Sequence, residues 1–246
     1  MTQKYLCLIF GLVPSTISPV IKQMLHLVTQ LLRKHPAARI TFPDKEKMEY
    51  FSKLLRSREQ RVNDVIGFMD GLSLKIECKS DLDTQNAFYN GCQSDTGVSN
   101  VFIYGPDGKV FMCATNFPGS WPDSSICSKI LQYVSNHIGD YKICVDQGFP
   151  RDGAAYDIFV GPILEKSKNL SPILREKVLD KVNAYISLRQ AAEWGMRSLQ
   201  ISFPRIKRRL PTDSSLREKI ILSIVLLHNF GTEFVGINQI ASVFNP

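Results

Sequence analysis

The chain has 246 residues, of which 44% are hydrophobic and 22% are charged, so it can bury one sizeable core. Its 30 Lys and Arg residues against 23 Asp and Glu residues give a formal net charge of +7, which favours a polyanionic partner. The longest apolar run, residues 220–227, is far shorter than the roughly 20 residues that cross a bilayer, so a membrane partner is not expected.

The first segment of the chain, residues 1–43, is expected to be helical. Gly11 separates a short apolar stretch from a longer one, and Ser18 followed by Pro19 predicts the capped start of the second helix. Apolar residues then recur on one face of that helix, at Val20, Ile21, Met24, Leu27, Val28, Leu31 and Leu32. This pattern is typical of a helix-turn-helix, and an ordinary helical hairpin fits it equally. The polar residues 44–62 are expected to form a linker.

Residues 63–230 are expected to alternate strands and helices. The predicted elements are a buried strand at 65–69, a β-hairpin around 106–108, a helix capped by Asp123 or Ser124, strands at 141–145 and 157–164, and helices at 171–199 and 215–230. This order predicts an α/β fold of the RNase H-like type, in which helices flank a mixed sheet. Asn229 and Gly231 are expected to end the last helix, and residues 231–246 to form a tail.

Three acidic residues lie at informative points of these elements. Asp70 and Asp146 each follow an apolar strand, and Glu193 lies in the helix at 171–199. Carboxylates of this kind can hold two divalent cations, Mg²⁺ or Mn²⁺, about 3.5–4 Å apart for phosphodiester cleavage. Gly71 and Gly148 are expected to turn the backbone away and leave room for a phosphate.

Each of these charged residues also fits a simpler role. An Asp before a Gly at a strand end is typical of a turn. Glu193 has Arg189 and Arg197 four residues away on either side, which is the spacing of exposed helical salt bridges. Asp123 fits either an accessory ligand or a helix cap. A basic run fits either phosphate binding or a solvated face: Arg205, Lys207, Arg208 and Arg209.

The sequence around the three acids resembles that of PIF/Harbinger-type DDE transposases. GFMDG is similar to the motif of the family's first catalytic Asp, at Asp70, and VDQGFP to that of the second, at Asp146. VNAYISLRQAAEWG is similar to the motif of the third acid, at Glu193. AFYNGC, GPDGKV, PGSWPDS and LLHNF look like further family blocks, so the resemblance runs over roughly residues 5–230.

This resemblance implies a metal-dependent DNA endonuclease or transposase in which Asp70, Asp146 and Glu193 hold two Mg²⁺ or Mn²⁺ ions. DNA, as transposon ends and target site, would be its substrate. The chain departs from the family at residues 71–73, where G-T-H is usual, and at Gln147, and it is expected to be clipped at its start. A catalytically inactive, domesticated or decaying DNA- or protein-binding module therefore stays open as the alternative, as does a nuclease that acts on RNA or a hybrid.

The resemblance also implies a location and a partner. Family members often rely on a Myb/SANT-like protein for specific DNA binding and nuclear import, so a nuclear location is expected. The cysteines agree with an intracellular protein, because they are scattered and none forms a C-x-x-C pair: Cys7, Cys78, Cys92, Cys113, Cys127 and Cys144.

Overall fold

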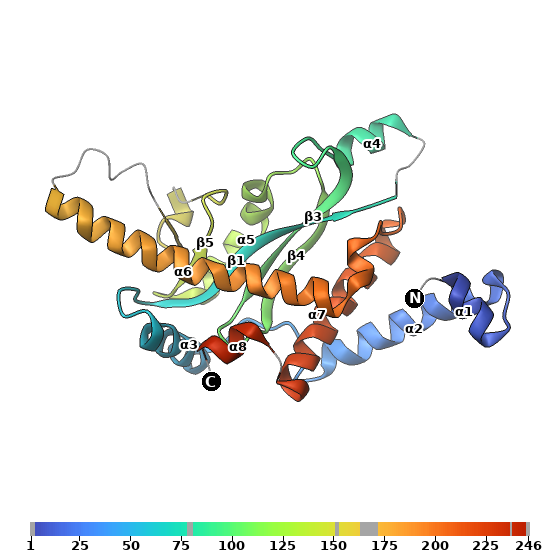
Figure 1. Ribbon diagram of the computed structural model, residues 1–246, viewed down its shortest axis with the longest axis horizontal. Coiled ribbons are helices and arrows are strands. Elements are labelled where there is room, and N and C mark those ends of the chain that lie inside the picture. The colour runs from blue at the N-terminus through green and yellow to red at the C-terminus, as the bar shows by residue number, and fades with distance from the viewer. Residues whose placement is uncertain (1–2, 78–80, 151–152, 163–171, 237, 245–246) are drawn as a thin grey trace.

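The computed structural model describes residues 3–77, 81–150, 153–162, 172–236 and 238–244. Its centre is a mixed sheet flanked by helices, and two N-terminal helices project from one end (Figure 1). The strands are β1 (Val65–Lys75), β2 (Tyr89–Asn90), β3 (Asp95–Tyr104), β4 (Val110–Pro118), β5 (Lys142–Val145) and β6 (Phe159–Val160). The helices around the sheet are α3 (Lys45–Arg58), α4 (Leu82–Phe88), α5 (Asp123–Ile138), α6 (Pro172–Ser202), α7 (Ser214–Val235) and α8 (Gln239–Phe244).

The sheet combines an antiparallel and a parallel half. β3 pairs antiparallel with β1 and with β4, and the short β2 joins the start of β3. β5 pairs parallel with β1 on one side and with β6 on the other. The predicted hairpin of β3 and β4 is confirmed, and Gly108 adopts the positive φ of +79° that its turn requires. A mixed sheet flanked by helices is likewise confirmed, and it is compatible with an RNase H-like fold.

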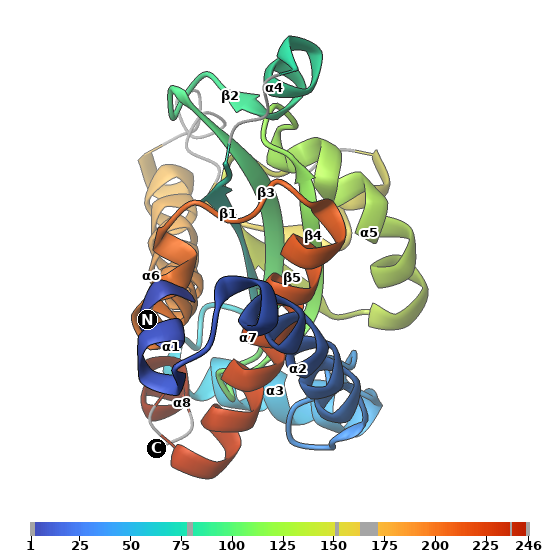
Figure 2. The same ribbon diagram turned by 90° about the vertical axis from the view of Figure 1, so that its right-hand side faces the viewer.

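Side chains of β1 alternate between two hydrophobic clusters, one on each face of the sheet. Ile66 and Met69 pack in the cluster that contains α5, whereas Phe68 and Leu72 pack in the cluster that contains α6 and α7. Figure 2 shows α5 and α6 on opposite sides of the sheet. The strand is therefore buried on both faces and forms a rigid support for the polar residue in its middle.

Part of the expected linker is helical. Residues 45–58 form α3, whose first N–H groups are capped by Asp44, because its Oδ1 accepts a hydrogen bond of 2.9 Å from the Lys47 N–H. Met48, Phe51 and Leu55 lie at three-to-four spacing and are all buried against the sheet. The spacing of these apolar residues outweighs the polar composition that favoured a loop.

Helical structure also extends into the expected tail. α7 continues past Asn229 and Gly231 to Val235 and ends at Gly236, whose φ of +68° gives a left-handed cap. Both residues that were expected to stop α7 lie within it. Asn229 serves packing, since its Oδ1 accepts a hydrogen bond of 2.8 Å from the Val110 N–H. α8 follows, with Ile240 buried in the core.

The N-terminal segment is a helical hairpin of α1 (Gln3–Phe10) and α2 (Pro14–Lys34), bent by 103° at the turn. α2 begins at Pro14, so Pro19 lies inside the helix and the predicted Ser18 cap is wrong. Pro14 can begin the helix because its missing N–H would have no intrahelical partner there. α2 packs on α7, where the hydroxyls of Thr29 and Ser223 form a buried hydrogen bond of 2.6 Å. A DNA-binding helix-turn-helix stays a prediction.

No single described helix is long and apolar enough to cross a bilayer, and α1 and α2 meet those criteria only as a bent pair. None of the five described cysteines forms a disulfide, and Cys78 lies outside the described residues.

Candidate active site

Strand pairing brings the two predicted aspartates together. β1 and β5 run parallel with Met69 opposite Val145, so the next residue of each strand, Asp70 and Asp146, occupies the same level of the sheet. Neighbouring strands lie about 4.8 Å apart, which sets the distance between the two backbones. Asp146 follows the last residue of β5, as predicted. Asp70 does not close its strand, because β1 continues to Lys75 along β3.

Asp70 is exposed to the site because β5 ends beside it. Burial raises the pKa of the Asp70 carboxyl to about 6, and the negative charges of Asp146 and Asp123 also raise it. A hydrogen bond of 2.8 Å from the Gly71 N–H to Asp70 Oδ1 and the positive charge of Arg189 act in the opposite direction. Asp70 is thus held among other carboxylates at an energetic cost, which a bound cation would relieve.

Glu193 is carried by α6, which lies across the sheet on the face of Asp70. Leu188, Ala191 and Ala192 are buried beneath the helix. Gly195 permits a close approach, because a Cβ at this position would lie 2.8 Å from the Tyr104 ring. The Glu193 side chain remains half exposed. The position of Glu193 near the end of β5 therefore depends on how α6 packs on the sheet, and not on backbone pairing between strands.

Arg189 connects the helix to the strands. Its Nη2 lies 3.1 Å from Glu193 Oε1, one helical turn along α6, and its Nη1 lies 3.4 Å from Asp146 Oδ2. The predicted salt bridge of Glu193 with Arg189 is therefore confirmed. The contact with Asp146 joins residues that are far apart in sequence, so helical spacing alone gave no sign of it.

Asp123 reaches the same place from α5. The N-cap of α5 is Pro122 and has no side-chain cap hydrogen bond, so the predicted capping by Asp123 or Ser124 is wrong. Asp123 is instead the first residue of the helix, and its carboxylate lies against Gly71. Burial and the charge of Asp146 raise the pKa of Asp123. Gly71 continues the strand and does not turn the backbone away as expected.

The donor chemistry of these residues suits a divalent metal ion. Hard carboxylate oxygens are the ligands that Mg²⁺ and Mn²⁺ prefer, and several lie near the point where β5 ends beside the middle of β1. Within the described residues, no three His, Cys, Asp or Glu side chains are arranged closely enough to hold a metal ion as they stand. Glu193 and Asp146 share the guanidinium of Arg189, and they would have to exchange this cation for a metal.

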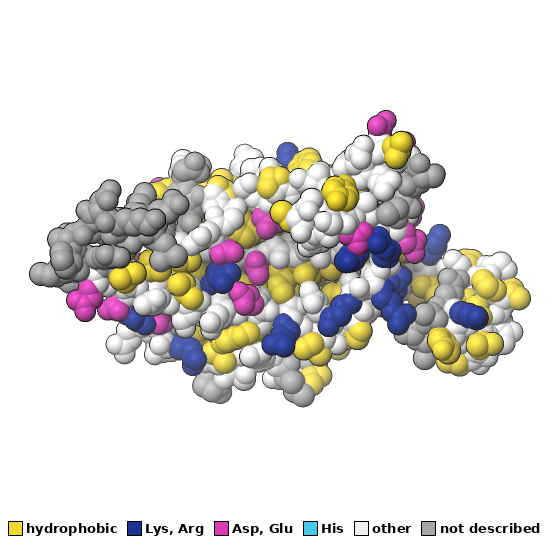
Figure 3. Space-filling model, turned by 45° about the horizontal axis from the view of Figure 1, so that its top comes forward, with side chains coloured by type: hydrophobic (Ala, Val, Ile, Leu, Met, Phe, Trp, Pro, Cys, Tyr) yellow, Lys and Arg dark blue, Asp and Glu magenta, His cyan; other side chains and the backbone are white. Residues whose placement is uncertain are grey.

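The predicted basic residues follow α6 at the 3-10 turn η3 (Pro204–Lys207), and they divide into two kinds. Arg209 is committed to the fold, because its Nη2 lies 2.9 Å from Asp95 Oδ1 and its Nη1 donates to the Ile76 carbonyl at 2.9 Å. Arg205, Lys207 and Arg208 are exposed and make no hydrogen bond or ion pair with the sheet among the described residues. Arg205 Nη1 donates to the Arg209 carbonyl at 2.9 Å within the same segment. Figure 3 shows a band of Lys and Arg side chains between the body and the lobe of α1 and α2, separate from a group of acids.

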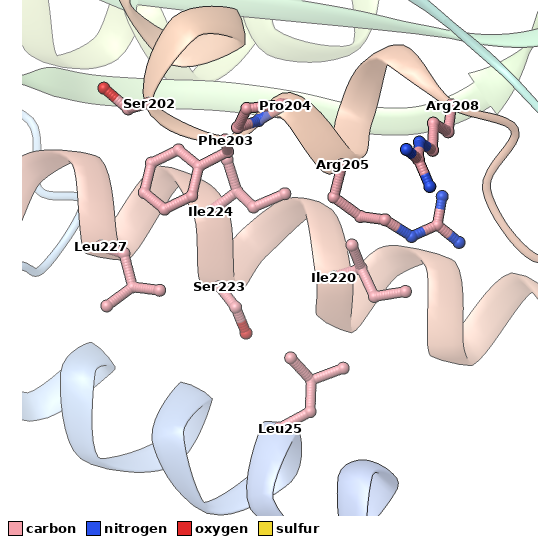
Figure 4. Close-up of a pocket in the computed structure, with 10 residues that line it drawn as sticks. All are labelled: Leu25, Ser202, Phe203, Pro204, Arg205, Arg208, Ile220, Ser223, Ile224 and Leu227. Carbon is pink, nitrogen blue, oxygen red and sulfur yellow. The ribbon is translucent and has the colours of Figure 1, made fainter. Parts of the chain in front are cut away.

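Two of these cations line the end of a groove. Arg205 and Arg208 place their guanidinium groups side by side there, and the apolar walls come from α2 and α7 (Figure 4). The groove has a volume of about 420 Å³. It combines positive charge at one end with apolar walls.

The LLHNF motif near the end of the chain is structural. His228 Nε2 lies 3.1 Å from the carbonyl oxygen of Gly108, and Asn229 bonds both backbone groups of Val110. Burial lowers the pKa of His228. His228 and Asn229 are both buried, and their side chains fix α7 to the hairpin between β3 and β4.

A helix-flanked mixed sheet that is compatible with an RNase H-like fold, with acids on two neighbouring parallel segments, is the arrangement expected of a carboxylate-dependent nuclease. Residues 69–229, about two thirds of the chain, match the family described as DDE superfamily endonuclease. The chain therefore belongs to the DDE superfamily endonucleases. The matched span begins in β1, ends in α7 and includes Asp70, Asp146 and Glu193. No curated protein and no solved structure matches the chain.

Proposed function

We propose that the chain is a metal-dependent DNA endonuclease of PIF/Harbinger type that cleaves phosphodiester bonds at transposon ends. The observation that carries this proposal is the register of β1 and β5, which sets Asp70 beside Asp146. Membership of the DDE superfamily endonucleases gives the reaction class. The motifs around the three acids support the subtype.

Asp70, Asp146 and Glu193 would hold the Mg²⁺ or Mn²⁺ ions. Such ions lower the pKa of an attacking water and stabilise the leaving oxygen during phosphodiester cleavage. The protein supplies the fixed spacing of two strand-borne carboxylates, and a helix that brings the third acid beside them. Arg189 neutralises Asp146 and Glu193 while no metal is bound, which reduces their mutual repulsion.

DNA would approach along the basic band. Arg205, Lys207 and Arg208 follow α6 directly and are exposed, which supports a role for them in contacting phosphates. The formal net charge of +7 favours the same partner. Specific recognition of transposon ends by a Myb/SANT-like partner in the nucleus is part of this proposal, and it is supported by the family resemblance alone.

Cleavage of a supercoiled plasmid tests the reaction. The wild-type protein is expected to nick the plasmid in Mg²⁺ or Mn²⁺ and not in EDTA, and Asp146→Asn is expected to abolish the nicking. Asp157→Asn is a matched control, because Asp157 is an exposed aspartate outside the site. Equal background in wild type and Asp146→Asn, with both proteins folded by circular dichroism, would contradict the proposal.

One observation favours a second candidate, a DNA- or protein-binding module that does not cut. Arg189 already satisfies Asp146 and Glu193 with a fixed cation, so these two acids do not need a metal for stability. The two candidates separate in one comparison. Only the endonuclease predicts metal-dependent nicking that disappears in Asp146→Asn.

Binding to DNA has a test of its own. Replacing Arg205, Lys207, Arg208 and Arg209 together with alanine is expected to weaken binding and to reduce the dependence of log K on log salt, by about 0.9 for each lost phosphate contact. Fluorescence anisotropy of a labelled duplex over a range of salt concentrations measures this slope. An unchanged slope would rule out the basic band as the DNA contact.

A further inference from the structure

One apolar stripe of α2 is not covered by the described parts of the chain. It consists of four residues of the predicted apolar face that are between 42% and 69% exposed: Val20, Met24, Leu27 and Leu31. α2 packs on α7 through another side, where Thr29 bonds Ser223 and Leu25 points toward α7 (Figure 4). At about 100° per residue, Thr29 lies nearly opposite the stripe. A row of large apolar side chains at the surface of a globular protein is typical of an interaction site.

The spacing of the stripe is that of a coiled-coil seam. Steps of four, three and four residues separate its members, as between the d and a positions of successive heptads. This order of steps is the same when it is read backwards. An antiparallel copy of α2 therefore places Val20 opposite the partner's Leu31, and Met24 opposite the partner's Leu27. The stripe is thus complementary to itself, which is the property that a two-fold interface requires.

The residues beside the stripe carry little charge that would oppose this pairing. Gln23 and Gln30 border it on one side. Apolar residues border it on the other side: Ile21 and Val28. The one cation close to the stripe is Lys34 at its C-terminal end. Antiparallel pairing keeps the two copies of Lys34 roughly 25 Å apart along the helices, whereas parallel pairing would set them side by side. Association at this surface is therefore compatible with the formal net charge of +7.

The position of α2 also leaves room for a second copy in this orientation. The C-terminal end of α2 joins the body, and its N-terminal end projects away from the body together with α1 (Figure 1). Figure 3 shows apolar side chains at the surface of this lobe. Antiparallel pairing places the two bodies at opposite ends of the helix pair. Parallel pairing would bring both bodies to the same end.

We infer that the stripe of α2 is a homotypic interface, through which two copies of the chain pair about a two-fold axis between Leu25 and His26. This inference goes beyond the proposed function, because it involves neither the acids of the candidate site nor the basic band. Phosphates of DNA find no cation in the stripe itself. Four residues form a smaller contact than a standard interface of about 800 Å² per partner, so we expect a dimer that dissociates in the micromolar range.

The association state of the full chain tests the inference without metal or DNA. Sedimentation velocity from about 1 to 100 µM is expected to show a shift from one chain to two. Leu27→Glu places like charges near the centre of the seam, so it should weaken the dimer by at least about tenfold. His26→Glu is the matched control, because it adds the same charge on another side of α2, at an exposed residue. This control should dimerise like wild type.

The fold of Leu27→Glu is checked by thermal unfolding at the lowest concentration. Leu27 is exposed in the single chain, so the variant should unfold there at the temperature of wild type. A lower unfolding temperature at low concentration would show that Leu27 supports the fold of one chain, and it would contradict the assigned role of the stripe.

Cysteine cross-linking tests the direction of the pairing. Val20→Cys together with Leu31→Cys in one chain should give a disulfide-linked dimer, since the two positions face each other in the antiparallel pair. Either change alone should give none, because equal positions are then roughly 16 Å apart along the helices. All variants carry Cys92→Ser, because Cys92 is exposed, and the Cys92→Ser chain without further change gives the baseline.

Several results would overturn the inference, and none of them bears on the plasmid test of the proposed function. A single chain at every concentration would show that no second copy covers the stripe. Equal association of wild type and Leu27→Glu would place the contact elsewhere. Cross-linking of Val20→Cys alone would show parallel pairing. Species larger than two chains would show association through the lobe without a defined partner surface.

Discussion

The candidate active site has two halves that are built in different ways. In the strand half, backbone pairing of β1 and β5 places Asp70 beside Asp146, whatever the side chains around them do. In the helix half, Glu193 and Asp123 depend on how α6 and α5 pack on the sheet. Arg189 joins the halves through one contact to each.

The two halves differ in how much their residues can move. A pair of hydrogen-bonded strands fixes the spacing of two groups to within a fraction of the interstrand distance of about 4.8 Å. A helix held by side-chain packing can shift or rotate by a small amount as ligands exchange. The strand half is therefore suited to defining the centre of the site, and the helix half to closing it around metal and DNA.

The largest effects are expected from replacing one acid of each half, Asp70 of the strand half and Glu193 of the helix half. Asp70→Asn should reduce metal-dependent nicking on the order of 10³-fold or more. In EDTA at pH 8 it should also raise the free energy of unfolding by about 3 kcal/mol, because the wild-type Asp70 pKa of about 6 lies some two units above normal. Glu193→Gln should lose activity without this gain in stability. Plasmid nicking and urea unfolding measure the two quantities, and a destabilised Asp70→Asn would contradict the account.

The pH dependence of metal binding tests the strand half alone. Since Asp70 must lose its proton to bind a metal, Mn²⁺ affinity should fall by up to about tenfold per pH unit below pH 6. Without metal, the folded chain holds a proton on Asp70 between about pH 4 and 6 that the unfolded chain releases. The free energy of unfolding should therefore fall as pH rises across that window.

Mn²⁺ titrations from pH 5 to 8, and urea unfolding in EDTA from pH 4 to 8, measure the two effects. Asp70→Asn is the control for the unfolding curve, and it should remove the Asp70 contribution to the slope between pH 4 and 6. A Mn²⁺ affinity that stays constant from pH 7.5 to 5 would show that the Asp70 carboxyl does not bind the metal.

A smaller effect is expected at the link between the halves. Arg189→Gln removes the cation that Asp146 and Glu193 share, so Mn²⁺ no longer competes with it and should bind several-fold more tightly. The same variant should lose roughly 1 kcal/mol of stability in EDTA, because the salt bridges are partly exposed. Isothermal titration with Mn²⁺ measures the affinity. Weaker binding would instead show that Arg189 holds the acids in place for the metal.

The smallest effect separates structural from DNA-binding cations in the segment after α6. Arg209→Ala should destabilise the fold by about 1 kcal/mol, through loss of its bonds to Asp95 and the Ile76 carbonyl, and leave the salt dependence of DNA binding unchanged. Arg208→Ala should leave stability unchanged and reduce the slope by about 0.9. Thermal unfolding measures the stability of each variant, and fluorescence anisotropy measures the salt dependence of DNA binding. A reduced slope in Arg209→Ala together with an unchanged slope in Arg208→Ala would show that Arg209, and not Arg208, contacts phosphate.

The sequence predicted what depends on local pattern. Apolar runs followed by Asp70 and Asp146 located the two strands, and the turn at Gly108 located the hairpin. α3 was missed although Met48, Phe51 and Leu55 have helical spacing, because its other residues are mostly polar.

The remaining differences come from tertiary contacts. Asp70 lies in the middle of β1 and is accessible because the neighbouring strand β5 ends beside it. The length of β5 relative to β1 cannot be predicted from the sequence of β1. The contact of Arg189 with Asp146, and that of Asp123 with Gly71, join residues brought together only by folding. Helical spacing assigned Arg189 to Glu193 and end preferences assigned Asp123 to a cap, since both rules consider one element at a time.

The strand pairing of Asp70 and Asp146 bears on how this chain would decay under random mutation. Substitutions of surface residues and most conservative changes in the core leave the pairing of two buried strands intact, so the spacing of these acids would persist through long sequence drift. Changes on the packing faces of α5 and α6 would displace Asp123 and Glu193 first. A related sequence that retains both strand aspartates can thus already have lost endonuclease activity. Glycines at the positions of Gly71 and Gly195, which allow α5 and α6 to pack closely, are therefore better indicators of an active enzyme than the aspartates themselves.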